Sequence, residues 1–262
     1  MNNILVLCFL GDPTLEPASV EGTGGFNVDS KELVQILSET KYNVTFITNY
    51  SFPGQPSVEE LASNIKLYRI KFIPGSLQNQ NLLKEQVDKI TKEVIKLSPP
   101  IESIFVIHSL YWFSGYISYK ISSVYHIPFI YTPVSLGYNK TKNGVALKCT
   151  CQEEWENIFL PKAALIFAIT YSEGEILSEH YNVSPSRIAV VGRIASLSRN
   201  IVSKEQYDKF EEKKRIYQKN HLAFFFSLCY HMEKHYISGM SDSKAASAAS
   251  IILSHSGKSQ CF

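Results

Sequence analysis

The residues best suited to chemistry lie in the segment 21–33, EGTGGFNVDSKEL, which holds three glycines within four positions. The segment follows the apolar run ILVLCFL at 4–10, which we predict to be a buried strand, and it leads into a predicted helix. Gly24 and Gly25 lack side chains, so backbone N–H groups there can approach a ligand closely. A helix N-terminus favours an anion, and a phosphate group is the obvious candidate. The segment therefore predicts a phosphate-binding turn, with a flexible glycine loop as the alternative.

The spacing of these glycines disfavours a nicotinamide dinucleotide. Such a site needs the pattern G-x-G-x-x-G and an acidic residue near the end of the second strand. Here the glycines stand at 22, 24 and 25, and the second predicted strand and its end, VTFITNY at 44–50, contain no Asp or Glu. A nicotinamide-dependent enzyme is therefore not expected.

Histidines and cysteines elsewhere in the chain do not form a metal-binding pattern. His231 and His235 can share a helix face, but the acidic residue of a His-Glu-x-x-His motif is missing between them. Cys149 and Cys151 form a single C-x-C without the second pair that a zinc site uses. No Ser-His-Asp arrangement can be assembled from motif context. We therefore expect neither a metal nor a cofactor.

The elements that must position the glycine turn are short apolar runs that alternate with segments of helical periodicity. We predict strands at 4–10, 44–48, 65–72, 104–108, 129–134, 165–170 and 188–191. Most of these runs are continuously apolar, which is typical of strands covered on both faces. Between them, apolar residues recur at i, i+3 and i+4, as on one face of a helix. This alternation predicts an α/β fold, a doubly wound and mostly parallel Rossmann-like sheet.

The sequence beyond Arg193 has a different character. Residues 203–220 are strongly charged with few apolar positions, which predicts a linker or a solvated helix. The run HLAFFFSLC at 221–229 predicts one more strand, and the residues after it are small and polar without periodicity. We therefore predict a Rossmann-like domain at 1–200, followed at 201–262 by an irregular or helical tail that contains the remnant of a truncated second domain.

Composition and charge fit an ordinary folded protein. Hydrophobic residues make up 45% and charged residues 19% of the chain, and the net charge is +2. This small charge favours neither nucleic acid nor a membrane surface as a partner. No apolar run approaches the ~20 residues that a membrane helix needs. The five cysteines are irregularly spaced, which favours a reducing compartment, so we expect a cytoplasmic location.

Three ordered blocks of the sequence resemble family 4 retaining glycosyltransferases with the GT-B fold. The blocks are GGFNVDSKELVQILSETKYNVTFIT at 24–48, HSLYWFSGYISYKISSVYHIPFIYTPVSLG at 108–137 and EEWENIFLPKAALIFAITYSEGEILSEHYNVSPSRIAVVGR at 153–193. The subgroup that looks most similar includes sucrose-phosphate synthase-like enzymes and the N-acetylglucosaminyltransferases of mycothiol and aminoglycoside assembly. The resemblance covers roughly residues 4–193 and implies the N-terminal, acceptor-side domain of such an enzyme, with the C-terminal donor domain essentially absent.

The resemblance implies roles for the matching positions. Gly24 and Gly25 would meet the diphosphate or the transferring sugar of the donor through their backbone N–H groups. The implied acceptor-binding residues are Asn27, His108, Tyr111 and Ser135. His108 is expected at the carboxyl end of a strand, the edge where open α/β sheets bind ligands, with a capping or core histidine as the alternative.

Departures from the family pattern restrict the implied substrate. A loop histidine that many members carry near the transferring sugar is Val134 here. An arginine that a phosphate-accepting relative uses, four residues before a glutamate, aligns with Gln152, and the glutamate is Glu156. Losing a guanidinium removes a bidentate partner for phosphate. We therefore expect a neutral or cationic polyol, such as an aminocyclitol, rather than a sugar phosphate.

The resemblance implies transfer of a sugar, with retention, from a nucleotide-diphosphate donor, most plainly a UDP-sugar, to a hydroxyl group of a small acceptor. The leaving diphosphate would be stabilised by helix N-termini and basic side chains, so the scheme requires no metal. An alternative is a non-catalytic acceptor-binding subunit that needs a separate donor-binding chain. A third possibility, an unrelated Rossmann protein that binds a nucleotide or a sugar phosphate, is disfavoured by the three ordered blocks.

Overall fold

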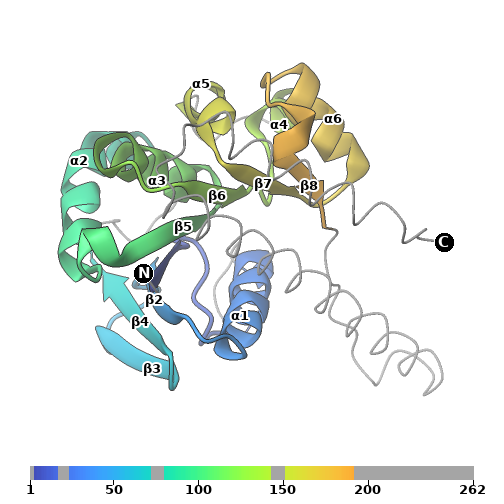
Figure 1. Ribbon diagram of the computed structural model, residues 1–262. Helices are drawn as coiled ribbons and strands as arrows, with labels where there is room; N and C mark the ends of the chain where they lie inside the picture. Colours follow the sequence, from blue (N-terminus) through green and yellow to red (C-terminus); the bar gives the residue numbers. More distant parts are fainter. Residues whose placement is uncertain (1–2, 17–23, 72–79, 143–150, 192–262) are drawn as a thin grey trace, which may run out of the picture.

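A computed structural model describes residues 3–16, 24–71, 80–142 and 151–191, which fold around one eight-stranded sheet (Figure 1). The strands are β1 (Asn3–Leu7), β2 (Asn43–Asn49), β3 (Val58–Ala62), β4 (Ile65–Ile70), β5 (Ile104–Leu110), β6 (Phe129–Thr132), β7 (Leu165–Ala168) and β8 (Ile188–Val190). Their order is β3-β4-β2-β1-β5-β6-β7-β8, and every neighbouring pair is parallel except β3 with β4. The predicted doubly wound, mostly parallel sheet is confirmed.

The strand order reverses direction at β1. The chain first builds outward from β1 through β2 to β4, and it then crosses back to place β5 on the other side of β1. In open α/β sheets, ligands bind outside the carboxyl ends of the strands at such a switch point. The segments that follow β1 and β5 are therefore the first place to look for a site.

Helices cover both faces of the sheet. They are α1 (Gly24–Ser38), α2 (Gln80–Leu97), α3 (Trp112–Tyr125), α4 (Gly137–Lys142), α5 (Cys151–Phe159) and α6 (Tyr171–Glu179), with single 3-10 turns at Ile101–Ser103, Leu160–Lys162 and Pro185–Arg187. Figure 1 shows α1 on one face and α2, α3 and α5 on the other. The β1 side chains alternate accordingly, since Ile4 and Val6 pack with the α1 core whereas Leu5 and Leu7 pack with the opposite core.

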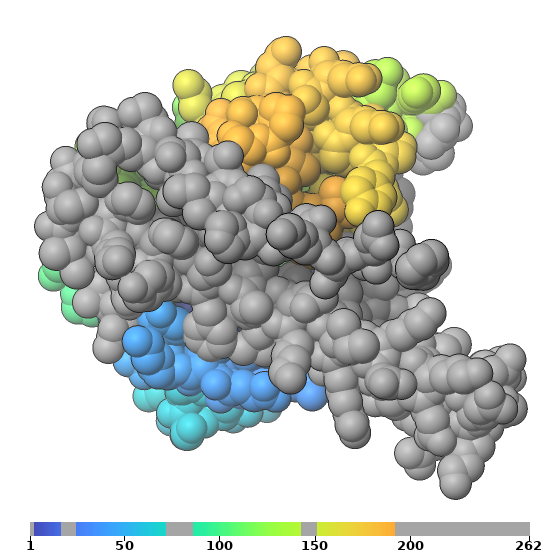
Figure 2. Space-filling model, turned by 45° about the vertical axis from the view of Figure 1, so that its right-hand side comes forward, coloured from blue at the N-terminus to red at the C-terminus, as the bar shows by residue number. Residues whose placement is uncertain are grey.

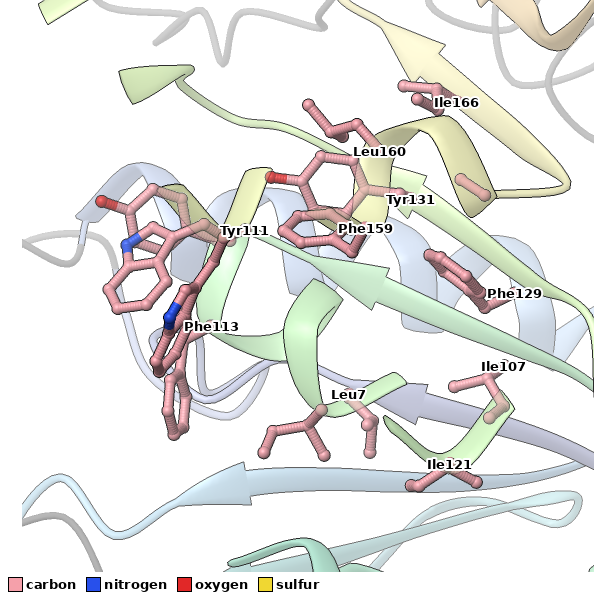
Figure 3. Packing of buried hydrophobic residues seen from close by; sticks show 14 of the residues in the cluster. Leu7, Ile107, Tyr111, Phe113, Ile121, Phe129, Tyr131, Phe159, Leu160 and Ile166 are labelled. Atoms are coloured by element: carbon pink, nitrogen blue, oxygen red, sulfur yellow. The ribbon is translucent and has the colours of Figure 1, made fainter. Parts of the chain in front are cut away.

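The larger of the two cores contains a group of aromatic side chains from α3 and α5 (Figure 3). The Trp112 ring lies 5.2 Å from the Trp155 ring, edge to face, and Phe113 stacks on Trp155 at 6.3 Å. Gly115 lets α3 approach both α5 and β6, because a Cβ atom at this position would lie only 2.7 Å from the Phe159 ring and 2.8 Å from the Tyr131 ring. This packing fixes the N-terminal turn of α3, which follows directly on β5.

The outer faces of the helices are exposed. Figure 2 shows α1, in blue, and the α6–β8 segment, in orange, at the molecular surface. Within the described part of the chain, no helix is both long and apolar enough to cross a membrane. The region predicted as a tail at 201–262, including the strand predicted at 221–229, lies outside the described residues, so the predicted domain boundary stays a prediction.

Candidate functional site

The first part of the site is the connection between β1 and α1. Helix α1 begins at Gly24, so Gly24 and Gly25 lie in its first turn, on the side of the sheet's switch point. The strand side of the connection packs tightly against this turn, because a Cβ atom on Gly11 would lie 2.5 Å from the backbone oxygen of Phe26. The two glycines are thus part of the helix, rather than of the turn before it as predicted, and their contact with a donor stays a prediction.

Asn27 joins the two ends of this connection. Its side chain is buried, and its Oδ1 atom accepts the backbone N–H of Asp12 at 3.1 Å. Its Nδ2 group donates to the backbone oxygen of Glu16 at 3.4 Å. The amide therefore holds the backbone of the segment after β1 in place. A direct contact of Asn27 with an acceptor stays a prediction.

A buried ion pair, which the sequence did not indicate, anchors the same segment to β4. The Nε and Nη2 groups of Arg69 donate to the two carboxylate oxygens of Asp12 at 2.7 and 3.2 Å. The remaining N–H groups of Arg69 donate to Thr14 Oγ1, Glu59 Oε2 and the Pro56 backbone oxygen, so all five guanidinium donors are used. Burial raises the pKa of Asp12, but hydrogen bonds from Arg69 and Thr14 outweigh this effect and hold the pKa below its ordinary value.

Tyr111 begins the second part of the site, directly after β5. It is the N-cap of α3 and has φ 71°, a left-handed conformation that a non-glycine residue adopts only under constraint. Its ring meets the Phe26 ring edge to face at 5.0 Å, which links it to the first turn of α1. The β1 and β5 sides of the switch point are therefore in contact.

The loop after the neighbouring strand, β6, shows the same kind of strain. Val134 has φ 59°, which is unusual for a β-branched residue, and Ser135 donates its N–H to the Pro133 backbone oxygen at 2.6 Å. The Ser135 backbone oxygen accepts a hydrogen bond from Gln152 Nε2 at 3.2 Å. Two strained non-glycine residues after adjacent strands, at one edge of the sheet, are typical of a functional site.

Lys140, on α4, contacts Tyr111 after β5 and Gln152 on α5. Its ammonium group donates to the Tyr111 hydroxyl and to Gln152 Oε1, both at 2.9 Å, and lies 5.1 Å from the centre of the Tyr111 ring. Gln152 occupies the position where a phosphate-accepting relative has an arginine. A cation is nevertheless present beside Tyr111, because Lys140 reaches it from another helix. The sequence analysis missed Lys140, since nothing in the spacing of 12 residues between Lys140 and Gln152 indicates their contact.

The buried side chain of Glu156 holds Gln152 and the start of α4 in place. Its carboxylate is fully buried and accepts hydrogen bonds from Gln152 Nε2 at 2.8 Å, the Gly137 backbone N–H at 2.8 Å and the Tyr181 hydroxyl at 2.6 Å. Burial raises its pKa to about 7, although the hydrogen bonds from Tyr181 and Gln152 act in the opposite direction. A carboxyl group whose charge changes near neutral pH is thus built into the support of the β6–α4 loop.

His108 differs from the other predicted residues, because it lies inside the sheet rather than at its edge. It is two residues short of the end of β5, is 2% exposed, and packs edge to face on the Phe167 ring at 5.7 Å. Its Nε2 atom lies 3.0 Å from Thr132 Oγ1. This environment is that of the core histidine considered above, and its contact with an acceptor stays a prediction.

Among the predicted residues, the structure joins Tyr111 and Ser135 through Gln152 and Lys140, and it places the first turn of α1 against Tyr111. These groups bring an ammonium group, a phenol and a side-chain amide together beside strained backbone at the switch point. Within the described ranges, no group of three or more His, Cys, Asp or Glu side chains could hold a metal ion.

A mostly parallel α/β sheet in this order, with polar groups gathered at its switch point, is the architecture of the N-terminal domain of GT-B glycosyltransferases. The solved sucrose-phosphate synthase from Thermosynechococcus elongatus superposes with a TM-score of 0.60 at 20% identity, over 75% of this chain and 49% of that structure. The fold expected from the family resemblance is confirmed.

The sequence relatives are glycosyltransferases. A protein of Pseudarthrobacter chlorophenolicus named D-inositol 3-phosphate glycosyltransferase is 27% identical over 198 residues, which cover 72% of this chain and 46% of the relative. A Corynebacterium diphtheriae protein of the same name is 24% identical over 183 residues, 68% of this chain and 43% of the relative. The matched region thus spans less than half of the length of these relatives. No protein-family model matches the chain.

Proposed function

We propose that the described domain is the acceptor-side half of a retaining glycosyltransferase that transfers a sugar from UDP to a hydroxyl group of a polyol. The observation that carries the proposal is the Tyr111–Lys140–Gln152 cluster, which meets the first turn of α1 at the sheet's switch point. The likeness to named glycosyltransferases supports the reaction class. We assign the donor diphosphate to the N–H groups of Gly24 and Gly25.

The charge of Lys140 restricts the acceptor further than the sequence did. An ammonium group beside Tyr111 repels a cationic acceptor and attracts an anionic or neutral one. We therefore rank a neutral cyclitol or its phosphate above an aminocyclitol. The relatives' name, D-inositol 3-phosphate glycosyltransferase, agrees with this order.

The proposal also concerns the residues that bind the donor. Because the chain matches less than half of the relatives' length, we assign the remaining donor contacts to sequence outside the described residues or to a second polypeptide. On the second assignment the chain is an acceptor-binding subunit. The odd, irregular set of cysteines in the sequence favours a cytoplasmic location for either form, although Cys151 is disulfide-bonded in the structure.

Isothermal titration of the 262-residue chain tests the acceptor assignment. The ligands are myo-inositol, inositol 3-phosphate, an aminocyclitol and a UDP-sugar panel, each at constant pH and salt. We expect heat with myo-inositol and with inositol 3-phosphate. Their affinity should be about tenfold lower in Tyr111→Phe, because the hydrogen bond between the Tyr111 hydroxyl and the Lys140 ammonium is lost. Tyr125→Phe is the matched control, since Tyr125 ends the same helix and is exposed.

The outcomes separate the forms of the proposal. Binding of a cyclitol without any UDP-sugar supports an acceptor half that needs a separate donor half. Binding of both, followed by release of UDP on mixing, supports a complete enzyme. No heat with any cyclitol, or equal affinity in the Tyr111→Phe and Tyr125→Phe variants, refutes the placement of the acceptor beside Tyr111.

A further inference from the structure

The carboxylate of Glu156 accepts hydrogen bonds from three separate segments of the proposed acceptor site. Its three hydrogen-bond donors come from separate segments: Gly137 opens α4, Gln152 lies one turn earlier on α5, and Tyr181 follows α6. The Tyr181 hydroxyl also accepts the N–H of Tyr138 at 3.1 Å. Glu156 and Tyr181 thus fix the first two residues of α4.

The hydrogen bonds through Gln152 have a defined direction. Lys140 donates to Gln152 Oε1, and Gln152 Nε2 donates to Glu156 Oε1. A flipped amide would point its NH₂ group at the Lys140 ammonium and its oxygen at the carboxylate, so the orientation is set from both ends. The buried carboxylate is therefore connected to the surface ammonium through one side-chain amide.

The three converging donors match the ionised form of Glu156. A carboxylate accepts through both oxygens and donates nothing, whereas a protonated carboxyl group carries an O–H on one oxygen and lacks the negative charge that strengthens these bonds. Protonation thus weakens the set of hydrogen bonds. These bonds run to α4, to Tyr181 and to Gln152, and each of these holds the β6–α4 loop.

We propose that Glu156 is a positioning residue of the acceptor site, whose carboxylate form holds Lys140 and the β6–α4 loop in the arrangement that binds the acceptor. The inference rests on the proposed function and deepens it, because it makes acceptor affinity depend on pH. Glu156 acts through Gln152 and Gly137 and does not itself touch the acceptor.

Glu156 is suited to this role because its charge changes near neutral pH. Burial raises its pKa to about 7, against hydrogen bonds from Tyr181, Gln152 and Gly137 and the charge of Lys140. The titratable and charged side chains that face it or its immediate partners are Tyr111, Tyr131, Lys140, Glu153, Glu173, His180 and Tyr181. Burial also raises the pKa of Tyr131 and Tyr181, so both phenols stay protonated across the range tested. Glu156 is thus the group beneath the β6–α4 loop whose charge change is moved by burial toward neutral pH.

The backbone N–H of Gly137 reports the charge of Glu156 directly. In a pH series of ¹⁵N-¹H spectra of the 262-residue chain, we expect the Gly137 cross-peak to shift with a midpoint near pH 7. In Tyr181→Phe the midpoint should rise, since the carboxylate loses one stabilising donor. A cross-peak that does not titrate between pH 5.5 and 8.5, or an unchanged midpoint in Tyr181→Phe, overturns the inference.

Acceptor affinity is measured with myo-inositol, which has no titrating group. Only the carboxylate form is competent, so the apparent affinity at pH 6 should be about tenfold weaker than at pH 8. Glu156→Gln should bind weakly at both pH values, because its amide NH₂ faces donors in place of an acceptor oxygen. A purely structural role would lower the melting temperature of Glu156→Gln and leave the pH dependence of binding unchanged, and this result overturns the inference.

The two measurements separate the inference from the proposed function. If myo-inositol and inositol 3-phosphate do not bind while Gly137 titrates near pH 7, the proposed function fails and the control of the loop by Glu156 stands. If they bind with a pH-independent affinity, the proposed function stands and the inference fails.

Discussion

Replacing Arg69 by methionine tests whether the buried ion pair with Asp12 holds the segment after β1. The Arg69 side chain is 1% exposed and the Asp12 side chain is 0% exposed, so neither charge is screened by water. Removing one partner of such a pair leaves the other buried and uncompensated, which costs about 3–5 kcal/mol. Thr14 and Gln55 still donate to the Asp12 carboxylate. We therefore expect the lower end, about 3 kcal/mol, in the free energy of unfolding at pH 7.

The pH dependence of this penalty has a definite sign. In the wild type the pKa of Asp12 is lowered, so its contribution to stability is present above the unfolded pKa and is lost as the pH falls through the folded pKa. In Arg69→Met the carboxylate loses its cation and can relieve the penalty by taking up a proton. The difference between the variant and the wild type should therefore be smaller at pH 4 than at pH 7.

Urea unfolding of both proteins at the two pH values measures this difference. Lys66→Met is the matched control, because Lys66 lies on the same strand and its contact with Glu60, at 3.6 Å, is exposed. Exposed pairs of this kind contribute about 0–1 kcal/mol. A loss in Arg69→Met no larger than that in Lys66→Met at pH 7, or a loss that grows at pH 4, refutes the reasoning.

Three further predictions follow from the packing and the hydrogen bonds. Gly115→Ala should lower the free energy of unfolding by about 1–3 kcal/mol, because its Cβ would lie 2.7 Å from the Phe159 ring. Gly174→Ala is the control and should not destabilise the protein, since its Cβ would have no atom nearer than 3.5 Å. Urea unfolding compares the two variants. Thr170→Ala should cost about 1 kcal/mol in the same assay, since Thr170 Oγ1 accepts the Glu173 N–H that opens α6. The pKa of Glu156 is raised from 4.5 to about 7, so its contribution makes the free energy of unfolding fall as the pH rises from 4.5 to about 7. This pH dependence should be absent in Glu156→Gln. An identical pH dependence in the variant contradicts the raised pKa of Glu156.

The sheet could be predicted because its strands are buried on both faces. The seven predicted strands all occur, each with boundaries within a few residues of those expected. The strand that the sequence did not predict, β3, has the sequence VEELA, is only partly buried and pairs antiparallel at the edge of the sheet. An edge strand needs no continuous apolar run, so its sequence lacks the signal that identifies the others.

The site was predictable where the chain direction alone determines position. Gly24, Tyr111 and Ser135 follow consecutive elements of a parallel sheet, so they come to the same edge whatever their side chains do. The partners of a buried polar group are set by tertiary contacts. Arg69 reaches Asp12 across 57 residues, and no local periodicity encodes such a pair.

The position of the positive charge in the site shows what a comparison of aligned positions omits. Gln152 stands where a phosphate-accepting relative has an arginine, and the sequence alone argued for the loss of an anion-binding group there. Lys140 restores a cation beside Tyr111 from a different helix, 2.9 Å from the amide oxygen of that glutamine. The ammonium is in turn oriented by Gln152, whose other amide atom is held by the buried carboxylate of Glu156. The charge of a binding site is therefore a property of the whole cluster, and the acceptor preference must be derived from Lys140, Gln152 and Glu156 together.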